Sequence, residues 1–520
     1  MGGRAVAVLL LCVAALVAGC TVGPSQRPPV AVRGEGTPPR PSAPAPPPPP
    51  TRLPEPEPAG AELEFRPCTG DRTAQAVPAP TDRTLSVGCT ALTVESDPQQ
   101  PGQGRTRVGL LRVGLADAPP DRPPLLVVGD TATIPSSAVA RVLANRVPVA
   151  LLQRYTLVGL DRRGAGLDDL DCGPTLARTA FVDIDPGGDG APPRLDALLE
   201  QARSVVQDCY LVHSGALTGF RTSSTAADLE QVRASLGVAH LNAVGGGDGA
   251  AALSAWARTH PDAVGRLVLD GPTPALDEPD AGEARAAAAE SAFDAFTAAC
   301  AAGPECPLGA DPRAVVASFV DRLRGQPITA ADGRRLTAGM LVTVLLAGLG
   351  EPIGWPDLGT AIGQAQGGDP TAVLDRLTTL VSVGGGVDVA LATACNDVRR
   401  RLTPGEVGDL VARWRTTYPM FGATMAQRIL ACGPWPPSTD TPAPDPGPDL
   451  PPVLVVGVAH GPRAALEAAR RIAGTTPGAV FLSWQGAGTG AYPRTACVTA
   501  AVDALLLDGT PPADGTLCPP

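Results

Sequence analysis

The residues most relevant to chemistry in this chain form a short glycine-rich run, "GGGDG" (245–249). An apolar segment typical of a buried strand precedes the run (241–244), and an alanine-rich segment typical of a helix follows it (250–259). A strand, a sharp turn and a helix in this order present a nucleophilic serine when the turn reads G-x-S-x-G. The serine position here is Gly247, so the residues predict the frame of a nucleophilic site without its nucleophile.

Asp248 is the side chain in this run that could take the place of the serine. A shift of the turn by one residue would make Asp248 a carboxylate nucleophile between the small residues Gly246 and Ala250. The ester that it would form needs a histidine to activate water. However, the strand leads into the run without a gap and places Asp248 one position past the apex, and no histidine lies beyond His460. Asp248 is therefore the less favoured alternative.

Alternating apolar and amphipathic segments must position this turn. Strands are predicted at residues 106–115, 124–128, 155–160, 241–244 and 267–271, with helices at 138–147 and 225–236. This alternation predicts a mostly parallel sheet covered by helices on both faces. Residues 275–436 then read almost entirely as helix, and strands at 453–456 and 479–484 return the chain to the sheet. The expected architecture is an α/β core with an inserted helical cap.

The N-terminus indicates export. Arg4 precedes an apolar run (5–18) that is too short to span a bilayer. The run ends at Val17-Ala18-Gly19-Cys20, which resembles a bacterial lipobox with Cys20 as the lipidated residue. An ordinary cleaved signal with an incidental cysteine is the alternative. Two acyl chains would anchor the protein stably, so we expect an extracytoplasmic lipoprotein whose partner is the membrane surface.

Composition sets the remaining boundaries. Residues 24–60 are rich in proline and predict a semi-rigid tether rather than a packed core. The expected division is a signal peptide (1–19), a tether (20–60), the first part of the core (61–274), the cap (275–440) and a C-terminal part of the core (441–520). A net charge of −11 without a basic cluster argues against nucleic acid as a partner.

Cysteine usage fits an exported chain. Cys12 and Cys20 belong to the signal segment, and ten further cysteines predict five disulfides. Pairing of sequence neighbours is the simplest connectivity, although the sequence alone leaves it open. No C-x-x-C or His-Cys cluster is present, so we expect neither a metal nor another cofactor. The ten are Cys68, Cys89, Cys172, Cys209, Cys300, Cys306, Cys395, Cys432, Cys497 and Cys518.

Eight motifs in order carry a family likeness. They are "VGLDRRGAG" (158–166), "TAADLEQVRASLGVAHLNAVGGGDG" (225–249), "HPDAVGRLVLDG" (260–271), "ACNDVRRRL" (394–402), "CGPWP" (432–436), "PVLVVG" (452–457), "WQGAGTGAY" (484–492) and "DGTPPADGTLC" (508–518). Together they resemble the secreted tripeptidyl-aminopeptidase-like α/β-hydrolases of actinobacteria, serine peptidases of the prolyl-aminopeptidase group with a TAP-like C-terminal module. The likeness runs from about Cys68 to Cys518 and implies an α/β-hydrolase fold.

The resemblance also implies where a catalytic triad would lie, in the order Ser, Asp, His. Its serine falls on Gly247. Its acid would follow "PVLVVG" in a motif like G-x-x-D-P-V-T-P, where this chain has His460. Its base would be the histidine of G-H-G-x-Y, where this chain has Thr489. All three members are replaced while the surrounding motifs are kept.

The turn expected to supply the oxyanion hole is changed as well. It reads Gly129-Asp130-Thr131-Ala132, and a carboxylate there would oppose the negative charge that develops in acyl transfer. Loss of one donor from such a hole typically lowers the rate about 100- to 1000-fold. We interpret His460 as a loop residue that replaces a dispensable acid, and His213, His240 and His260 as structural.

Two hypotheses from different classes follow. The favoured one is a catalytically inactive α/β-hydrolase homologue that acts as a binding or scaffolding lipoprotein, with a peptide or small apolar ligand in a cleft under the cap. The alternative is an active hydrolase with a rearranged site, such as one with Asp248 as nucleophile. A purely structural envelope protein would differ from the first only in lacking a ligand. The sequence leaves the oligomeric state open.

Overall fold

The computed structural model describes most of the chain after the proline-rich segment. The described residues are 53–60, 63–68, 82–119, 121–166, 169–188, 194–273, 277–382, 386–437, 450–464 and 466–520. The predicted signal peptide, Cys20 and most of the tether lie outside these residues. Among the helices in these ranges, none has the length and apolar character needed to cross a bilayer.

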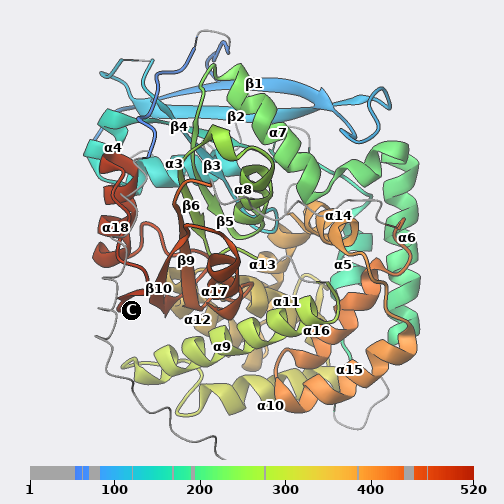
Figure 1. Cartoon of the computed structure of the whole chain (residues 1–520). Helices are drawn as coiled ribbons and strands as arrows, with labels where there is room; N and C mark the ends of the chain where they lie inside the picture. The colour runs from blue at the N-terminus through green and yellow to red at the C-terminus, as the bar shows by residue number, and fades with distance from the viewer. Residues whose placement is uncertain are drawn as a thin grey trace, which may run out of the picture. The chain divides into compact units, whose positions relative to one another are not determined.

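A nine-stranded sheet forms the centre of the described part, in the order β1-β2-β4-β3-β5-β6-β9-β10-β11 (Figure 1). β1 pairs antiparallel with β2 and β2 with β4, and every later pairing is parallel. The central strands are short apolar runs buried on both faces, as parallel strands covered by helices require. The strands are β1 (Leu85–Glu95), β2 (Arg105–Leu115), β3 (Pro124–Val128), β4 (Thr156–Leu160), β5 (Leu241–Gly246), β6 (Val264–Asp270), β9 (Val453–His460), β10 (Val480–Ala487) and β11 (Thr516–Cys518).

Helices cover the two faces of this sheet through separate apolar clusters. Successive strand residues point to opposite faces, so Leu125 and Val127 of β3 join one cluster and Leu126 and Val128 join the other. The first cluster is completed by α3 (Ser136–Arg146), α4 (Val149–Arg154) and α18 (Ala496–Asp508). The second is completed by α7 (Thr222–Ser235), α8 (Gly247–Thr259) and α17 (Leu466–Thr475). This is the α/β-hydrolase architecture that the motifs predict.

A helical cap with its own apolar core interrupts the sheet between β6 and β9. Its helices are α9 (Asp280–Ala302), α10 (Pro312–Gly325), α11 (Ala338–Gly348), α12 (Trp355–Gln366), α13 (Thr371–Val381), α14 (Val387–Asp397), α15 (Pro404–Thr417) and α16 (Gly422–Ile429). A short hairpin, β7 (Ile328–Thr329) with β8 (Arg335–Leu336), lies between α10 and α11.

The cap also includes helices from an earlier part of the chain. α5 (Thr175–Val182) and α6 (Leu195–His213) follow β4, inside the segment expected to be core. Leu195 and Leu198 of α6 belong to the same apolar cluster as the cap helices, and α5 packs on α11 and α13. The sheet is already covered by other helices, so the apolar faces of α5 and α6 are buried against the cap instead.

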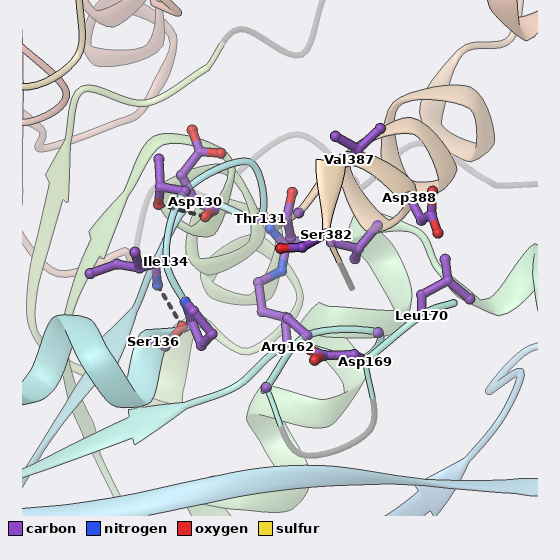
Figure 2. A pocket seen from close by; sticks show the side chains of 18 of the residues that line it. Asp130, Thr131, Ile134, Ser136, Arg162, Asp169, Leu170, Ser382, Val387 and Asp388 are labelled. Carbon is purple, nitrogen blue, oxygen red and sulfur yellow. Dashed lines mark hydrogen bonds between the residues drawn. The ribbon is translucent and has the colours of Figure 1, made fainter. Parts of the chain in front are cut away.

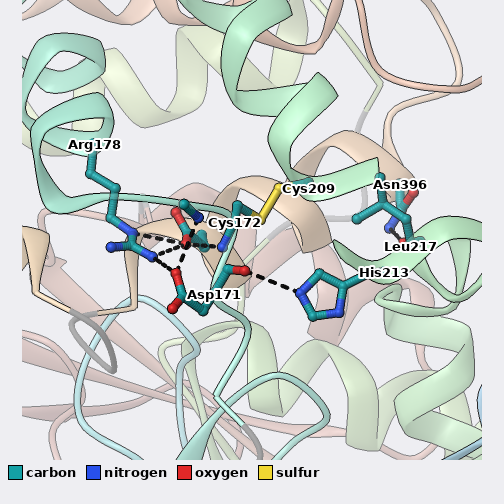
Figure 3. The surroundings of a disulfide bond; sticks show 9 residues. Asp171, Cys172, Arg178, Cys209, His213, Leu217 and Asn396 are labelled. Atoms are coloured by element: carbon teal, nitrogen blue, oxygen red, sulfur yellow. Dashed lines mark hydrogen bonds and ion pairs between the residues drawn. A yellow bond between two sulfur atoms is a disulfide. The ribbon is translucent and has the colours of Figure 1, made fainter. Parts of the chain in front are cut away.

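Five disulfides pair the ten cysteines as sequence neighbours. They are Cys68–Cys89, Cys172–Cys209, Cys300–Cys306, Cys395–Cys432 and Cys497–Cys518. The second and fourth share one small apolar cluster, where the segment after β4 meets α14. Figure 3 shows the second bridge beside Arg178, which pairs with Asp171 and with Asp388 of α14. Each of these two disulfides closes a loop within one cap segment, and the ion pair between Arg178 and Asp388 links the two segments.

Candidate functional site

The parallel sheet brings the positions singled out in the sequence to one edge. β3, β5, β9 and β10 run in the same direction, so the segments after them begin at the same edge of the sheet. Asp130 follows β3, Gly247 follows β5, His460 ends β9 and Thr489 follows β10. In open α/β sheets this carboxyl edge is where ligands bind.

Gly247 lies at a strained strand-to-helix turn. It is the first residue of α8 and has a φ of 56°, a left-handed conformation that favours glycine. A strained turn at this point is the feature that exposes a nucleophile in hydrolases of this fold. Asp248 is not among the residues with positive φ, so the apex of the turn is Gly247.

The space in front of Gly247 is filled by Asp130. A Cβ atom added to Gly247 would lie 2.7 Å from Cγ of Asp130 and closer still to its Oδ2. Real Cβ atoms essentially never approach another heavy atom within 3.0 Å. With Asp130 in this position, a serine side chain has no room at the apex.

An ion pair holds the Asp130 carboxylate in place. Nε of Arg463, in the segment after β9, donates to Oδ2 of Asp130 over 2.9 Å. Asp130 is almost fully buried, whereas Arg463 keeps part of its side chain exposed. Burial raises the pKa of the Asp130 carboxyl, the Arg463 guanidinium opposes this shift, and the charge of Asp248 adds to it.

Four backbone amides of the loop after β3 donate within the protein. Gly129 N donates to Ser136 Oγ, Thr131 N to Asp248 Oδ1, Ala132 N to Asp130 Oδ1 and Thr133 N to the Asp130 carbonyl. An oxyanion hole requires such N–H groups to point at the developing charge. These four amides are engaged elsewhere, so they do not form a hole in this arrangement.

Two hydrogen bonds and an ion pair hold the Asp248 carboxylate. Its Oδ1 accepts from Thr131 N over 2.9 Å and lies 2.7 Å from Nη1 of Arg162, and its Oδ2 accepts from Thr131 Oγ1. Arg162 is buried and extends toward Thr131, as Figure 2 shows. A carboxylate in such a network is stabilised in place.

The other two triad positions contact the cap. Nδ1 of His460 is 2.8 Å from Oγ of Ser291 in α9. The Thr489 amide donates over 2.8 Å to the carbonyl of Gly350, which lies just after α11. Each residue therefore links the sheet edge to a cap element.

The remaining histidines make local contacts. His213 contacts the Asp171 carbonyl, His240 contacts Glu57, and His260 contacts Thr259. Within the described ranges, no group of three or more His, Cys, Asp or Glu residues is arranged to hold a metal ion.

Asp270, at the end of β6, anchors the segment that carries Thr489. Its carboxylate accepts from the amides of Ala491 and Tyr492 over 2.8 to 2.9 Å. Burial raises the pKa of Asp270 to about 6, and the two amide donors lower it only in part.

A pocket lies beside the turn after β3. The turn, the segment after β4 and the first residues of α14 line it, including Thr131, Ser136, Asp169 and Asp388 (Figure 2). Arg162 also lines it, so this pocket adjoins the Asp248 network.

Sequence reasoning did not find Arg162, Arg463 and Asp270. Arg162 lies in a quoted motif, "VGLDRRGAG", but nothing in the motif names its partner. Arg463 comes three residues after His460 and meets Asp130, which is 333 positions away. The available signal was the position of Arg463, just after the expected acid position at His460. A buried carboxylate such as Asp130 at the sheet edge requires a counter-charge.

Comparison with known proteins agrees with the geometry. The model for the alpha/beta hydrolase fold matches residues 140–351, and the model for TAP-like protein matches residues 418–518. The two together cover more than half of the chain. The protein is a member of the TAP-like α/β-hydrolase family.

Curated relatives span nearly the same length. The chain is 26% identical over 497 residues to serine protease Hip1 of Mycobacterium tuberculosis, covering 88% of this chain and 91% of that protein. It is 27% identical over 472 residues to carboxylesterase B of the same organism, covering 85% of this chain and 88% of that protein. Among solved structures, carboxylesterase CesB from Bacillus subtilis has a TM-score of 0.36 at 14% identity, covering 85% of this chain and 96% of that one.

The raised pKa of Asp270 predicts a pH-dependent stability. The folded pKa of about 6 exceeds the ordinary 3.8. The contribution of Asp270 to the free energy of unfolding is therefore fully present at low pH and is lost as pH rises through about 6. A pKa shift of about two units corresponds to a free energy of about 3 kcal/mol. The free energy of unfolding of the wild type relative to Asp270→Asn, from denaturant titrations, should fall by roughly this amount between pH 4 and pH 7. A difference that stays constant across this range would contradict the shift.

The packing of Asp130 on Gly247 predicts an energetic coupling. Gly247→Ala should destabilise the fold by more than the roughly 1–2 kcal/mol of a left-handed alanine, because its Cβ also meets Asp130. Adding Asp130→Ala should remove the excess, a coupling measurable in a double-mutant cycle of unfolding free energies. Gly246→Ala is the matched control, since a Cβ there meets nothing within 4 Å. Additive single effects would mean that Asp130 does not fill this space.

Proposed function

We propose that the protein is a catalytically inactive α/β-hydrolase homologue, anchored outside the membrane through Cys20, that acts as a binding or scaffolding lipoprotein. The observation that carries the proposal is the position of Asp130. Its carboxylate fills the space in front of Gly247 and is held there by Arg463. Serine-type acyl transfer requires a nucleophile in this space and neutral or positive donors around it.

Three further features support the proposal. The amides of Gly129, Thr131 and Ala132 in the turn after β3 are engaged within the protein, so the stabilisation that survives the loss of a triad is weakened as well. His460 and Thr489 contact cap elements instead of forming a proton relay. The disulfides agree with an exported chain, because such bridges persist in oxidising compartments. The lipobox-like sequence before Cys20 remains the basis for the membrane anchor.

The alternative is an active hydrolase, and the names of the mycobacterial relatives favour it. One is called a serine protease and the other a carboxylesterase. Activity in this chain would need a different nucleophile, such as Asp248. That carboxylate is paired with Arg162 and accepts two hydrogen bonds from Thr131, which lowers its reactivity.

Hydrolysis assays separate the two functions. The purified full-length protein should not turn over aminoacyl or dipeptidyl chromogenic substrates or p-nitrophenyl esters above the buffer rate, because the nucleophile position is filled. Asp248→Asn should give the same result. Turnover by the wild type that disappears in Asp248→Asn, while the variant keeps its melting temperature, would overturn the proposal in favour of the aspartate nucleophile.

Restoring the triad tests the role of Asp130 directly. The triple variant Gly247→Ser, His460→Asp, Thr489→His should stay inactive, because Asp130 still occupies the space of the new serine. Adding Asp130→Gly should raise ester turnover at least about 100-fold above that of the triple variant. This is the change in rate that typically follows the loss of one oxyanion-hole donor. Circular dichroism and thermal unfolding must show that each variant is folded.

A matched charge removal controls for this last substitution. Asp262→Gly also removes a carboxylate, from an exposed turn after α8, and should leave the triple variant inactive. Activity in the triple variant itself would show that Asp130 does not block the site. A folded quadruple variant without activity would show that removing Asp130 is not enough to restore the site.

A further inference from the structure

Three arginines from adjoining elements form a cluster that the hydrolase fold does not explain. They are Arg285 of α9, Arg428 of α16 and Arg463 after β9, and we call them the arginine cluster. Arg463 pairs with Asp130, and Arg285 pairs with the buried Glu278. Arg428 has no carboxylate partner among the described residues. Its side chain donates to the neutral hydroxyl of Thr343 in α11, over 3.0 Å.

Packing around α9 places the elements that carry the three arginines next to one another. At the start of α9, a Cβ on Gly282 would lie 2.7 Å from Cδ1 of Ile429, the residue after Arg428. Farther along α9, Ser291 contacts His460, three residues before Arg463. α9 therefore runs past both α16 and the end of β9 (Figure 1).

The electrostatic surroundings of Arg428 are unfavourable for a cation. Burial, together with the like charges of Arg463 and Arg285, lowers its pKa to about 10. Buried charges in proteins are normally paired, because an uncompensated one is strongly destabilising. Arg428 nevertheless keeps part of its surface accessible. Two of the three guanidinium groups therefore have a carboxylate partner, and Arg428 is the one that has none among the described residues.

We propose that the arginine cluster binds an oxyanion group of a ligand, a carboxylate or a phosphate, with Arg428 as its main contact. A planar guanidinium matches both groups through two parallel N–H···O hydrogen bonds. The bound anion would supply the counter-charge that Arg428 lacks. The inference rests on the proposed function in one respect, because it takes the space between the cap and the filled elbow as a binding site.

Binding can be measured on the full-length protein with three probes. Trialanine carries a free carboxylate, trialanine amide lacks it, and inorganic phosphate is the other oxyanion. Calorimetric titration and thermal unfolding, at constant ionic strength to exclude screening, should show binding and a raised melting temperature with trialanine or phosphate. Trialanine amide should have no such effect. Phosphate alone would assign the site to phosphate, and trialanine alone to carboxylate.

Arg428→Met is the decisive variant. It should weaken binding about 10- to 100-fold, as expected for a lost hydrogen-bonded charge. Because it also removes repulsion from Arg285 and Arg463, it should not lower the melting temperature without ligand. Arg413→Met, on an exposed position of α15, is the matched control and should bind as the wild type does. If Arg428→Met does not fold, Arg428→Lys keeps the charge but loses the paired geometry and should bind with intermediate affinity.

The outcomes separate this inference from the proposed function. Absence of binding to both oxyanions, equal binding of trialanine and its amide, or unchanged binding in folded Arg428 variants would overturn the arginine site. Turnover of the chromogenic substrates in the same samples would overturn catalytic inactivity while leaving the oxyanion site intact. Oxyanion binding without turnover supports both.

Discussion

The ion pair between Asp130 and Arg463 determines what the carboxyl edge of this sheet can do. It joins the turn after β3 to the segment after β9 and places a carboxylate in front of Gly247. A buried carboxylate is tolerated only with a counter-charge, and Arg463 supplies it. The neighbouring pair of Arg162 with Asp248 fixes the second residue of the elbow in the same way. Two ion pairs therefore fix carboxylates at the turn where hydrolases of this fold carry their nucleophile.

The contacts around this edge stabilise the fold whether or not the site is catalytic. The sharp turn at Gly247 is the connection by which β5 enters α8, and both elements pack into the second apolar cluster. Arg163, in the segment after β4, pairs with the buried Asp228 of α7 and donates to the Ser96 carbonyl. Asp270 holds the segment after β10 through two backbone amides. Removing a nucleophile disturbs none of these contacts, so the fold can persist without the chemistry.

Elements with a strong periodic pattern were predictable. The strand predicted at 124–128 coincides with β3, and the helix predicted at 225–236 overlaps α7 over nearly its whole length. The cap membership of α5 and α6 was not predictable, because a helix with one apolar face does not specify which surface will cover it. β1 and β11 were also missed, since both lie at an edge of the sheet and only partly follow a buried-strand pattern.

Residue types in their order along the chain were enough to define the fold class, five disulfides and the absence of a serine, acid and histidine from the expected triad positions. They could not show that Asp130 fills the space of the missing serine, that Arg463 neutralises it, or that Arg428 lacks a carboxylate partner among the described residues. Motifs are local, and spacing within them indicates which side chain a turn presents. Charge pairing depends on contacts between residues hundreds of positions apart, which exist only when the parallel strands bring their carboxyl ends to one edge and the cap closes over them.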